Sequence, residues 1–164
     1  MAPFKYKLID LKGPAFRLLR LLKGDSFEDI QCQLFHTRLH QGEFGMSYEA
    51  LSYTWDGTER TQRIKIDGNV IGVIHNLHLA IEHLRSKDKD RILWIDAICI
   101  NQDNIQERGH QVQHITTIYK EAEQVIVWLG RATNETNLIM DSIKRLQEKA
   151  INYPYYSWKH SDER

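Results

Sequence analysis

The sequence has few of the features that stabilise secreted or membrane proteins. Its 164 residues include only two cysteines, Cys32 and Cys99, which lie far apart in apolar segments. Small secreted domains usually carry an even, closely spaced set of cysteines, so this pattern predicts reduced thiols and a cytoplasmic protein. No segment approaches the roughly 20 apolar residues of a membrane span, and we expect no association with a membrane.

The sequence also lacks an excess of charge of one sign. Lysine and arginine together number 22, and aspartate and glutamate together also number 22. Such a balance gives no general attraction to nucleic acid, and we expect no nucleic acid partner. The length is enough for one domain with a sizeable hydrophobic core.

Several common enzyme motifs are absent. The nine glycines form neither a Gly-x-Gly-x-x-Gly nor a Walker loop, and Ser52 lacks the Gly-x-Ser-x-Gly of a nucleophile elbow. A dinucleotide would therefore need another kind of phosphate contact. His110 and His114 have the spacing of a helical metal pair, but no glutamate follows His110 and no third ligand is indicated, so we predict no metal site.

The hydrophobic pattern predicts an α/β fold. Apolar strand-like segments alternate with helical segments in the second half of the chain, and this order predicts a parallel sheet flanked by helices. Asp67-Gly68-Asn69 favours a tight hairpin turn. The expected strands cover residues 16–22, 29–39, 50–55, 63–66, 70–73, 92–98 and 124–129, and the expected helices begin at Asn76, at Asp103 or Asn104, and at Asn134.

Short motifs follow one another in a fixed order between residues 48 and 130. They are YEALSYTW at 48–55, LWIDAICINQ at 93–102, ER at 107–108, IY at 118–119 and VWLG at 127–130. In this order they resemble the fungal heterokaryon incompatibility (HET) domain. The resemblance implies an effector module of fungal non-self recognition that triggers programmed cell death. It divides the chain into N-terminal strands and a loop (1–47), the HET core (48–150) and a flexible tail (151–164).

The order of strands and helices also resembles the Toll/interleukin-receptor (TIR) domain. The segments 50–53, 93–96 and 125–130 then correspond to the first three strands of a flavodoxin-like parallel sheet, with the N-terminal strands and the hairpin as additions. TIR domains either cleave the nicotinamide–ribose bond of NAD or act as scaffolds. The resemblance therefore implies an NAD glycohydrolase that requires no cofactor or, alternatively, a non-catalytic signalling scaffold. Both imply self-association on activation and contacts with other proteins or domains of the incompatibility pathway.

The ends of the expected parallel strands carry the candidate site residues, because ligands bind outside the carboxyl ends of such strands. An NAD-cleaving site needs a carboxylate for the ribose or an oxocarbenium-like centre, and aromatic and amide groups for the base. The candidate catalytic residues are Asp96, Glu107 and Glu135, and the candidate binding residues are Tyr53, Trp55, Asn101, Gln102 and Arg108.

Structural roles are open for several of the same residues. Glu107 would favour a helix N-terminus, and Asp96 would accept hydrogen bonds from backbone amides of its loop. Arg108 would hydrogen-bond the amide-rich loop from inside. Cys99 leaves a hydrolase with a cysteine nucleophile as a distant alternative, although a thiol in an apolar strand is usually a core residue.

Overall fold

The computed structural model describes residues 4–39, 45–55 and 57–151. The chain divides into two compact units, Met1–Gly130 and Arg131–Arg164, which are treated separately below. The predicted flexible tail lies outside the described residues, apart from Ile151, which ends the last helix. No helix in the described part is long and apolar enough to cross a membrane.

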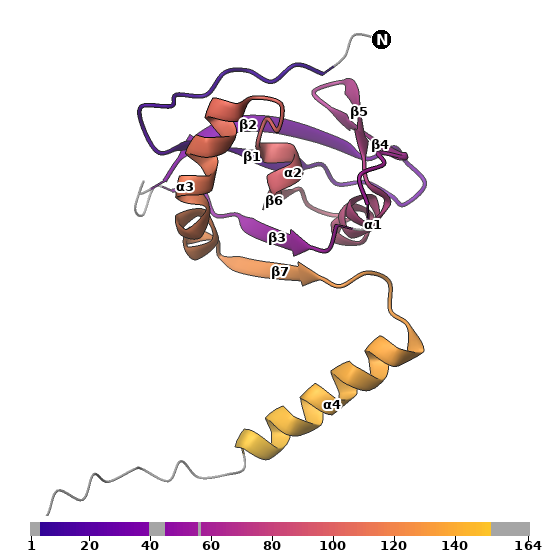
Figure 1. The fold of residues 1–164 in the computed structure, drawn as a ribbon. Coiled ribbons are helices and arrows are strands. Elements are labelled where there is room, and N and C mark those ends of the chain that lie inside the picture. The colour runs from indigo at the N-terminus through magenta and orange to yellow at the C-terminus, as the bar shows by residue number, and fades with distance from the viewer. Residues whose placement is uncertain (1–3, 40–44, 56, 152–164) are drawn as a thin grey trace, which may run out of the picture. The chain divides into compact units, whose positions relative to one another are not determined.

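A seven-stranded mixed sheet forms the first unit (Figure 1). Its strands are β1 (Ala15–Leu21), β2 (Gln31–Arg38), β3 (Glu49–Tyr53), β4 (Gln62–Ile66), β5 (Asn69–Val73), β6 (Arg91–Trp94) and β7 (Gln124–Trp128), in the order β5-β4-β2-β1-β6-β3-β7. β3 is parallel to β6 and β7, whereas β1 is antiparallel to β2 and β6. The predicted α/β class is confirmed, and the three strands predicted to be parallel share one mixed sheet with the N-terminal strands and the hairpin.

The N-terminal strands and the hairpin belong to the same sheet as the parallel strands. β1 lies between β2 and β6, and six of its seven residues are buried. Because both faces of β1 are covered, its apolar residues form the centre of the core and are not an addition at its margin. The segment 1–47 therefore supplies part of the same folding unit.

The β4–β5 hairpin turns where the sequence predicts it. Ile66 pairs with Asn69, so Asp67 and Gly68 form a two-residue loop. Their φ angles are 49° and 79°, and positive φ at both positions is the requirement of a type I′ turn. The Asp-Gly pair is thus the local cause of the hairpin.

Three helices, α1 (His75–Leu84), α2 (Asp96–Cys99) and α3 (Ile105–Glu121), complete the first unit, and α4 (Asn134–Ile151) belongs to the second. Asn104, one of the two residues predicted for this position, is the N-cap of α3 and accepts a hydrogen bond from the Glu107 amide at 3.1 Å. The predicted N-cap at Asn76 is wrong, because Ile74 occupies the cap position of α1.

The predicted strand over residues 92–98 is shorter than expected. β6 ends at Trp94, and the four residues that begin at Asp96 form the single helical turn α2. Ile98 and Cys99 are fully buried in this turn, so both side chains pack in the core from a helical conformation and not from a strand. An apolar run alone does not separate a buried strand from a buried helical turn.

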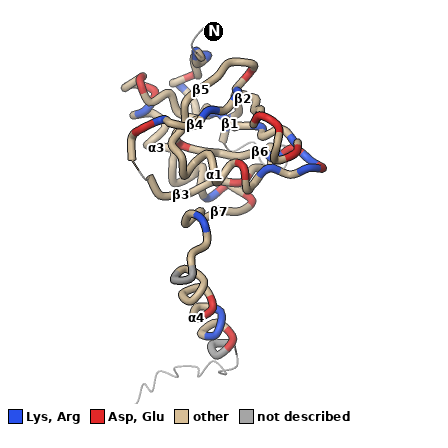
Figure 2. Tube along the Cα trace, turned by 90° about the vertical axis from the view of Figure 1, so that its right-hand side faces the viewer, with Lys and Arg blue, Asp and Glu red and all other residues tan. Residues whose placement is uncertain are grey.

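The three parallel strands end at a common edge. In the order β6-β3-β7, the second and third parallel strands flank the first, with α1 and α3 as connecting helices. Tyr53, the start of α2 and Trp128 therefore lie at the carboxyl ends of neighbouring strands, where open α/β sheets bind ligands. Along the trace in Figure 2, basic and acidic segments are interspersed, in line with the balanced charge.

Candidate functional site

A pocket opens at the carboxyl ends of β3 and β6. Its volume is about 210 Å³. One side comes from the end of β3 and the segment after it, another from α2 and its following loop, and a third from β5 and α1. The lining residues used below are Tyr6, Tyr53, Trp55, Arg60, Gly72, Ala97, Gln102 and Asp103.

Tyr53 and Trp55 give the pocket an aromatic wall. Their rings are nearly parallel, at 14°, with centroids 6.1 Å apart. Trp55 is 56% exposed, which is unusual for so large an apolar side chain and leaves its ring accessible to a ligand. Both were predicted as binding residues, and the structure brings them together.

Asp96 begins α2 next to Ala97, which lines the pocket, but Asp96 is not itself a lining residue. Its Oδ1 accepts a hydrogen bond from the Ala97 amide at 2.7 Å, so the structural role open to it from the sequence is present. Gln102, a second predicted residue, lines the pocket and donates from Nε2 to the Asp96 carbonyl oxygen at 3.0 Å. Burial raises the pKa of the Asp96 carboxyl, and the Ala97 amide lowers it by a smaller amount.

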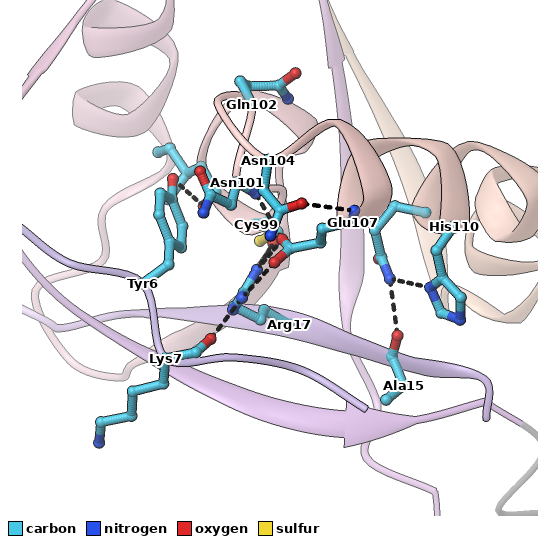
Figure 3. Close-up of polar contacts among 12 residues, drawn as sticks. Tyr6, Lys7, Ala15, Arg17, Cys99, Asn101, Gln102, Asn104, Glu107 and His110 are labelled. Atoms are coloured by element: carbon cyan, nitrogen blue, oxygen red, sulfur yellow. Dashed lines mark hydrogen bonds and ion pairs between the residues drawn. The ribbon is translucent and has the colours of Figure 1, made fainter. Parts of the chain in front are cut away.

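Glu107 lies in a buried ion pair on the other side of the same loop (Figure 3). Arg17 of β1 donates from both terminal nitrogens to the two carboxylate oxygens, with Nη2 2.9 Å from Oε2. The Asn101 amide donates to Oε1 at 2.7 Å. Both Glu107 oxygens are thus occupied, the residue is 1% exposed, and it does not line the pocket.

Arg17 binds several parts of the chain at once. Its Nη1 also donates to the Cys99 carbonyl at 3.1 Å, and its Nη2 donates to the Lys7 carbonyl at 2.6 Å. The ring of Tyr6 lies 4.9 Å from the guanidinium carbon, and the Tyr6 hydroxyl donates to the Ile98 carbonyl at 2.9 Å. The N-terminal segment, β1, α2 and α3 are therefore joined at one buried charge. We call this group the Arg17–Glu107 cluster.

The remaining predicted residues lie outside the pocket lining. Asn101 accepts a hydrogen bond from the Asp103 amide through its side chain. Arg108 donates to the Gln102 carbonyl at 3.4 Å, so the expected contact with the loop is present, but it lies on the surface and not on the inside as predicted. Glu135 lies in the first turn of α4, in the second unit, and its side chain is outside the described part. The catalytic roles of Asp96, Glu107 and Glu135 stay predictions.

Sequence reasoning missed several residues that the fold brings to this region. Arg17 had a signal, since it interrupts an otherwise apolar strand, and a buried charge requires a partner. Asn76 was predicted only as the start of a helix. It is buried at the start of α1, donates to the Thr54 carbonyl at 2.8 Å and accepts from the Trp128 indole at 2.9 Å. No signal in the sequence indicates Arg60 or Asp103 as pocket residues, because long-range packing alone places them there.

The candidates Cys99 and His110, named from the sequence, are engaged in the core or with the backbone. Cys99 is fully buried, and burial raises its pKa to about 12, so the thiol stays protonated near neutral pH. The Nε2 atom of His110 lies 2.9 Å from the carbonyl oxygen of Gly13, within hydrogen-bond distance. Among the described residues, no three histidine, cysteine or acidic side chains are grouped as metal ligands.

Comparison with known proteins gives a consistent family. Residues 48–164 match the family model described as heterokaryon incompatibility protein (HET). Heterokaryon incompatibility protein 6, OR allele, of Neurospora crassa is 32% identical over 165 residues, which cover 91% of this chain and 24% of that protein. The chain thus spans about a quarter of the length of this relative. No solved structure matches the chain.

Proposed function

Because the chain belongs to the heterokaryon incompatibility (HET) family, we propose that it is an effector module of fungal non-self recognition whose activation triggers cell death. The module would act in the cytoplasm, self-associate on activation, and bind other proteins or domains of the pathway. The strand order β6-β3-β7, with the second and third parallel strands on either side of the first, supports a TIR-like core.

The proposed reaction is hydrolysis of NAD at the pocket. Water attacks C1′ of the nicotinamide ribose, the bond from C1′ to the ring nitrogen breaks, and nicotinamide leaves with the bonding electrons. ADP-ribose, nicotinamide and one proton result. The observation that carries this proposal is the pocket itself, with an aromatic wall of Tyr53 and Trp55 and a lining residue, Ala97, that directly follows Asp96.

Each residue has a proposed part in this reaction. The Trp55 ring would stack on the nicotinamide, and Gln102 would bind its carboxamide through Oε1, which accepts no hydrogen bond from described residues. The ionised Asp96 would stabilise the oxocarbenium-like centre. Glu107 would act as a positioning residue, because it holds the Asn101 amide and hence the loop that carries Gln102.

A scaffold without catalysis is the second candidate, and the surface of β7 favours it. β7 is the last strand of the sheet, and Val125, Val127 and Leu129 are 47%, 62% and 60% exposed. An exposed apolar strand at a sheet edge is a common site of protein association. Signalling through such surfaces needs no substrate.

Incubation of concentrated protein with NAD, with and without a crowding agent, separates the two candidates. Nicotinamide release is measured for the wild type and for Asp96→Asn, Glu107→Gln and Glu135→Gln, and thermal unfolding identifies variants that fold. The proposal predicts turnover by wild type and its loss in folded Asp96→Asn. No nicotinamide release from the associated wild-type protein would refute the enzyme and favour the scaffold.

A further inference from the structure

Arg60 is a charged group at the pocket that no role described above uses. It lines the cavity together with Tyr6, and its guanidinium makes no hydrogen bond or ion pair with other residues in the described part of the chain. Other arginines near the site have partners: Arg17 binds Glu107, and Arg108 binds the Gln102 carbonyl. A guanidinium has a planar set of donors that fits phosphate oxygens, and that of Arg60 is unpaired within the described part of the chain.

The absence of a side chain at position 72 allows Arg60 to take this place. A Cβ built on Gly72 would lie 3.0 Å from the Arg60 Cβ and 3.3 Å from the Arg60 carbonyl oxygen. Both are tighter than ordinary van der Waals contacts, and the second involves backbone that has little room to move. Gly72 in β5 therefore lets the segment with Arg60 lie directly against the hairpin at the rim of the pocket.

The charge of Arg60 also acts inside the pocket. Burial raises the pKa of the Tyr6 hydroxyl to about 12, and the positive charges of Arg17 and, by a smaller amount, Arg60 oppose this rise. Asp103 contributes a carboxylate to the same lining. The pocket thus combines an aromatic wall, a carboxylate that can accept hydrogen bonds from ribose hydroxyls, and a cation.

The volume of the pocket limits the size of its ligand. Sites for drug-sized molecules usually enclose about 300–1,000 Å³, and this one encloses about 210 Å³. One nucleoside unit is a better match than a whole dinucleotide, whose second half would extend past the rim.

From these contacts we infer that the pocket binds one nucleoside monophosphate unit of a nucleotide, with the base against Tyr53 and Trp55 and the phosphate on Arg60. This inference rests on the proposed function for the choice of ligand class, because it names the part of NAD that the site holds. The sequence has no glycine-rich loop for phosphate binding, and Arg60 would make this contact instead.

Calorimetric titration of the full chain with AMP and with adenosine tests this inference. They stand in for the nicotinamide half of NAD, because each carries a planar base on a ribose but lacks the nicotinamide bond that the proposed reaction would break. The two probes differ only by the phosphate. A charge-assisted hydrogen bond contributes enough to bind AMP about tenfold or more tightly than adenosine. Arg60→Gln should remove this preference and leave the affinity for adenosine unchanged. Arg63→Gln changes an exposed arginine on the neighbouring strand that does not line this pocket, and it should keep the preference.

A second variant guards against an indirect effect. Gly72→Ala keeps all charges but pushes the Arg60 backbone away, so it should weaken the binding of AMP more than the binding of adenosine. Thermal unfolding checks that both variants fold. Equal affinity of the wild type for AMP and adenosine, binding of neither, or an equal loss for both probes in Arg60→Gln would overturn the inference.

The outcome is separable from that of the proposed reaction. AMP preference that depends on Arg60, without any nicotinamide release from NAD, would retain the phosphate site and reject the hydrolase. Nicotinamide release by a protein whose affinity for AMP does not change in Arg60→Gln would retain the hydrolase and reject the phosphate site.

Discussion

Two polar groups lie at the same loop and differ in how their charges are satisfied. In the Arg17–Glu107 cluster, the carboxylate faces a guanidinium and a backbone amide, and both residues are 1% exposed. At the pocket, Arg60 lacks a described partner and Trp55 is more than half exposed. The charged motif residue Glu107 therefore supports the loop from behind, while the open surface comes from the motif residues Tyr53, Trp55 and Gln102 together with Arg60, which lies outside the motifs.

The comparison also bears on where the domain begins. The family match starts at residue 48, but Arg17, which pairs with Glu107, and Tyr6, which lines the pocket, precede it. β1 further separates β2 from β6 in the middle of the sheet. Residues 4–39 thus contribute to the core, the loop support and the pocket of the same unit.

The largest effect is expected from Arg17→Met. This change leaves the Glu107 carboxylate buried without its cation, and breaking a buried ion pair in this way costs about 3–5 kcal/mol. Urea unfolding should report this loss in the free energy of unfolding. The double variant Arg17→Met/Glu107→Leu removes the unpaired charge and should recover part of the loss. A single variant within about 0.5 kcal/mol of wild type, the range of ordinary surface changes, would show that the cluster does not hold the loop.

A smaller effect is expected from Trp55→Ala at the open pocket. Trp55 is 56% exposed, and its stacking on Tyr53 accounts for about 0.5–1.5 kcal/mol, so the protein should lose about 1 kcal/mol. Trp94→Ala is the matched control, because Trp94 is fully buried and its loss should cost about 3–5 kcal/mol. Titration with AMP should show weakened binding for Trp55→Ala. Unchanged AMP affinity would remove the aromatic wall from the site.

The sequence predicts local features of this fold well. The Asp67-Gly68 turn, the Asn104 cap and the strands β3 and β7 follow from turn chemistry, capping and apolar runs of a few residues. The sheet order is not predicted, because the place of β1 depends on pairing between distant segments. Motif order places Tyr53, Trp55 and Gln102 near one another, since they follow strands that end at one edge.

The rest of the site depends on contacts that no local pattern specifies. Glu107 and Gln102 are five residues apart and serve opposite sides of one loop, and only the position of Arg17 on β1 decides which side holds the buried charge. Arg60 reaches the pocket because Gly72, on another strand, leaves room for it. Such roles appear only once the chain is folded.

The smallest effect in stability, and the only gain, is expected from Asp96→Asn. Burial raises the pKa of this carboxyl in the folded protein, so the unfolded chain gives up the proton at lower pH than the folded protein does. The stability of the wild type should therefore fall as pH rises from the ordinary carboxyl pKa through the raised one. Asparagine keeps an oxygen for the Ala97 amide but does not ionise, so the variant should be the more stable protein above this window.

Urea unfolding of both proteins between about pH 3 and pH 7 measures this difference, which should grow as pH rises and then become constant. Asn101→Asp is a useful control, because it introduces a carboxyl in the same loop outside the pocket lining. A variant less stable than wild type at neutral pH would mean that the Asp96 carboxylate is held for structure, like Glu107. A more stable variant that fails to release nicotinamide would mean that the protein keeps a destabilising acid beside its pocket, as proteins commonly do where stability is exchanged for activity.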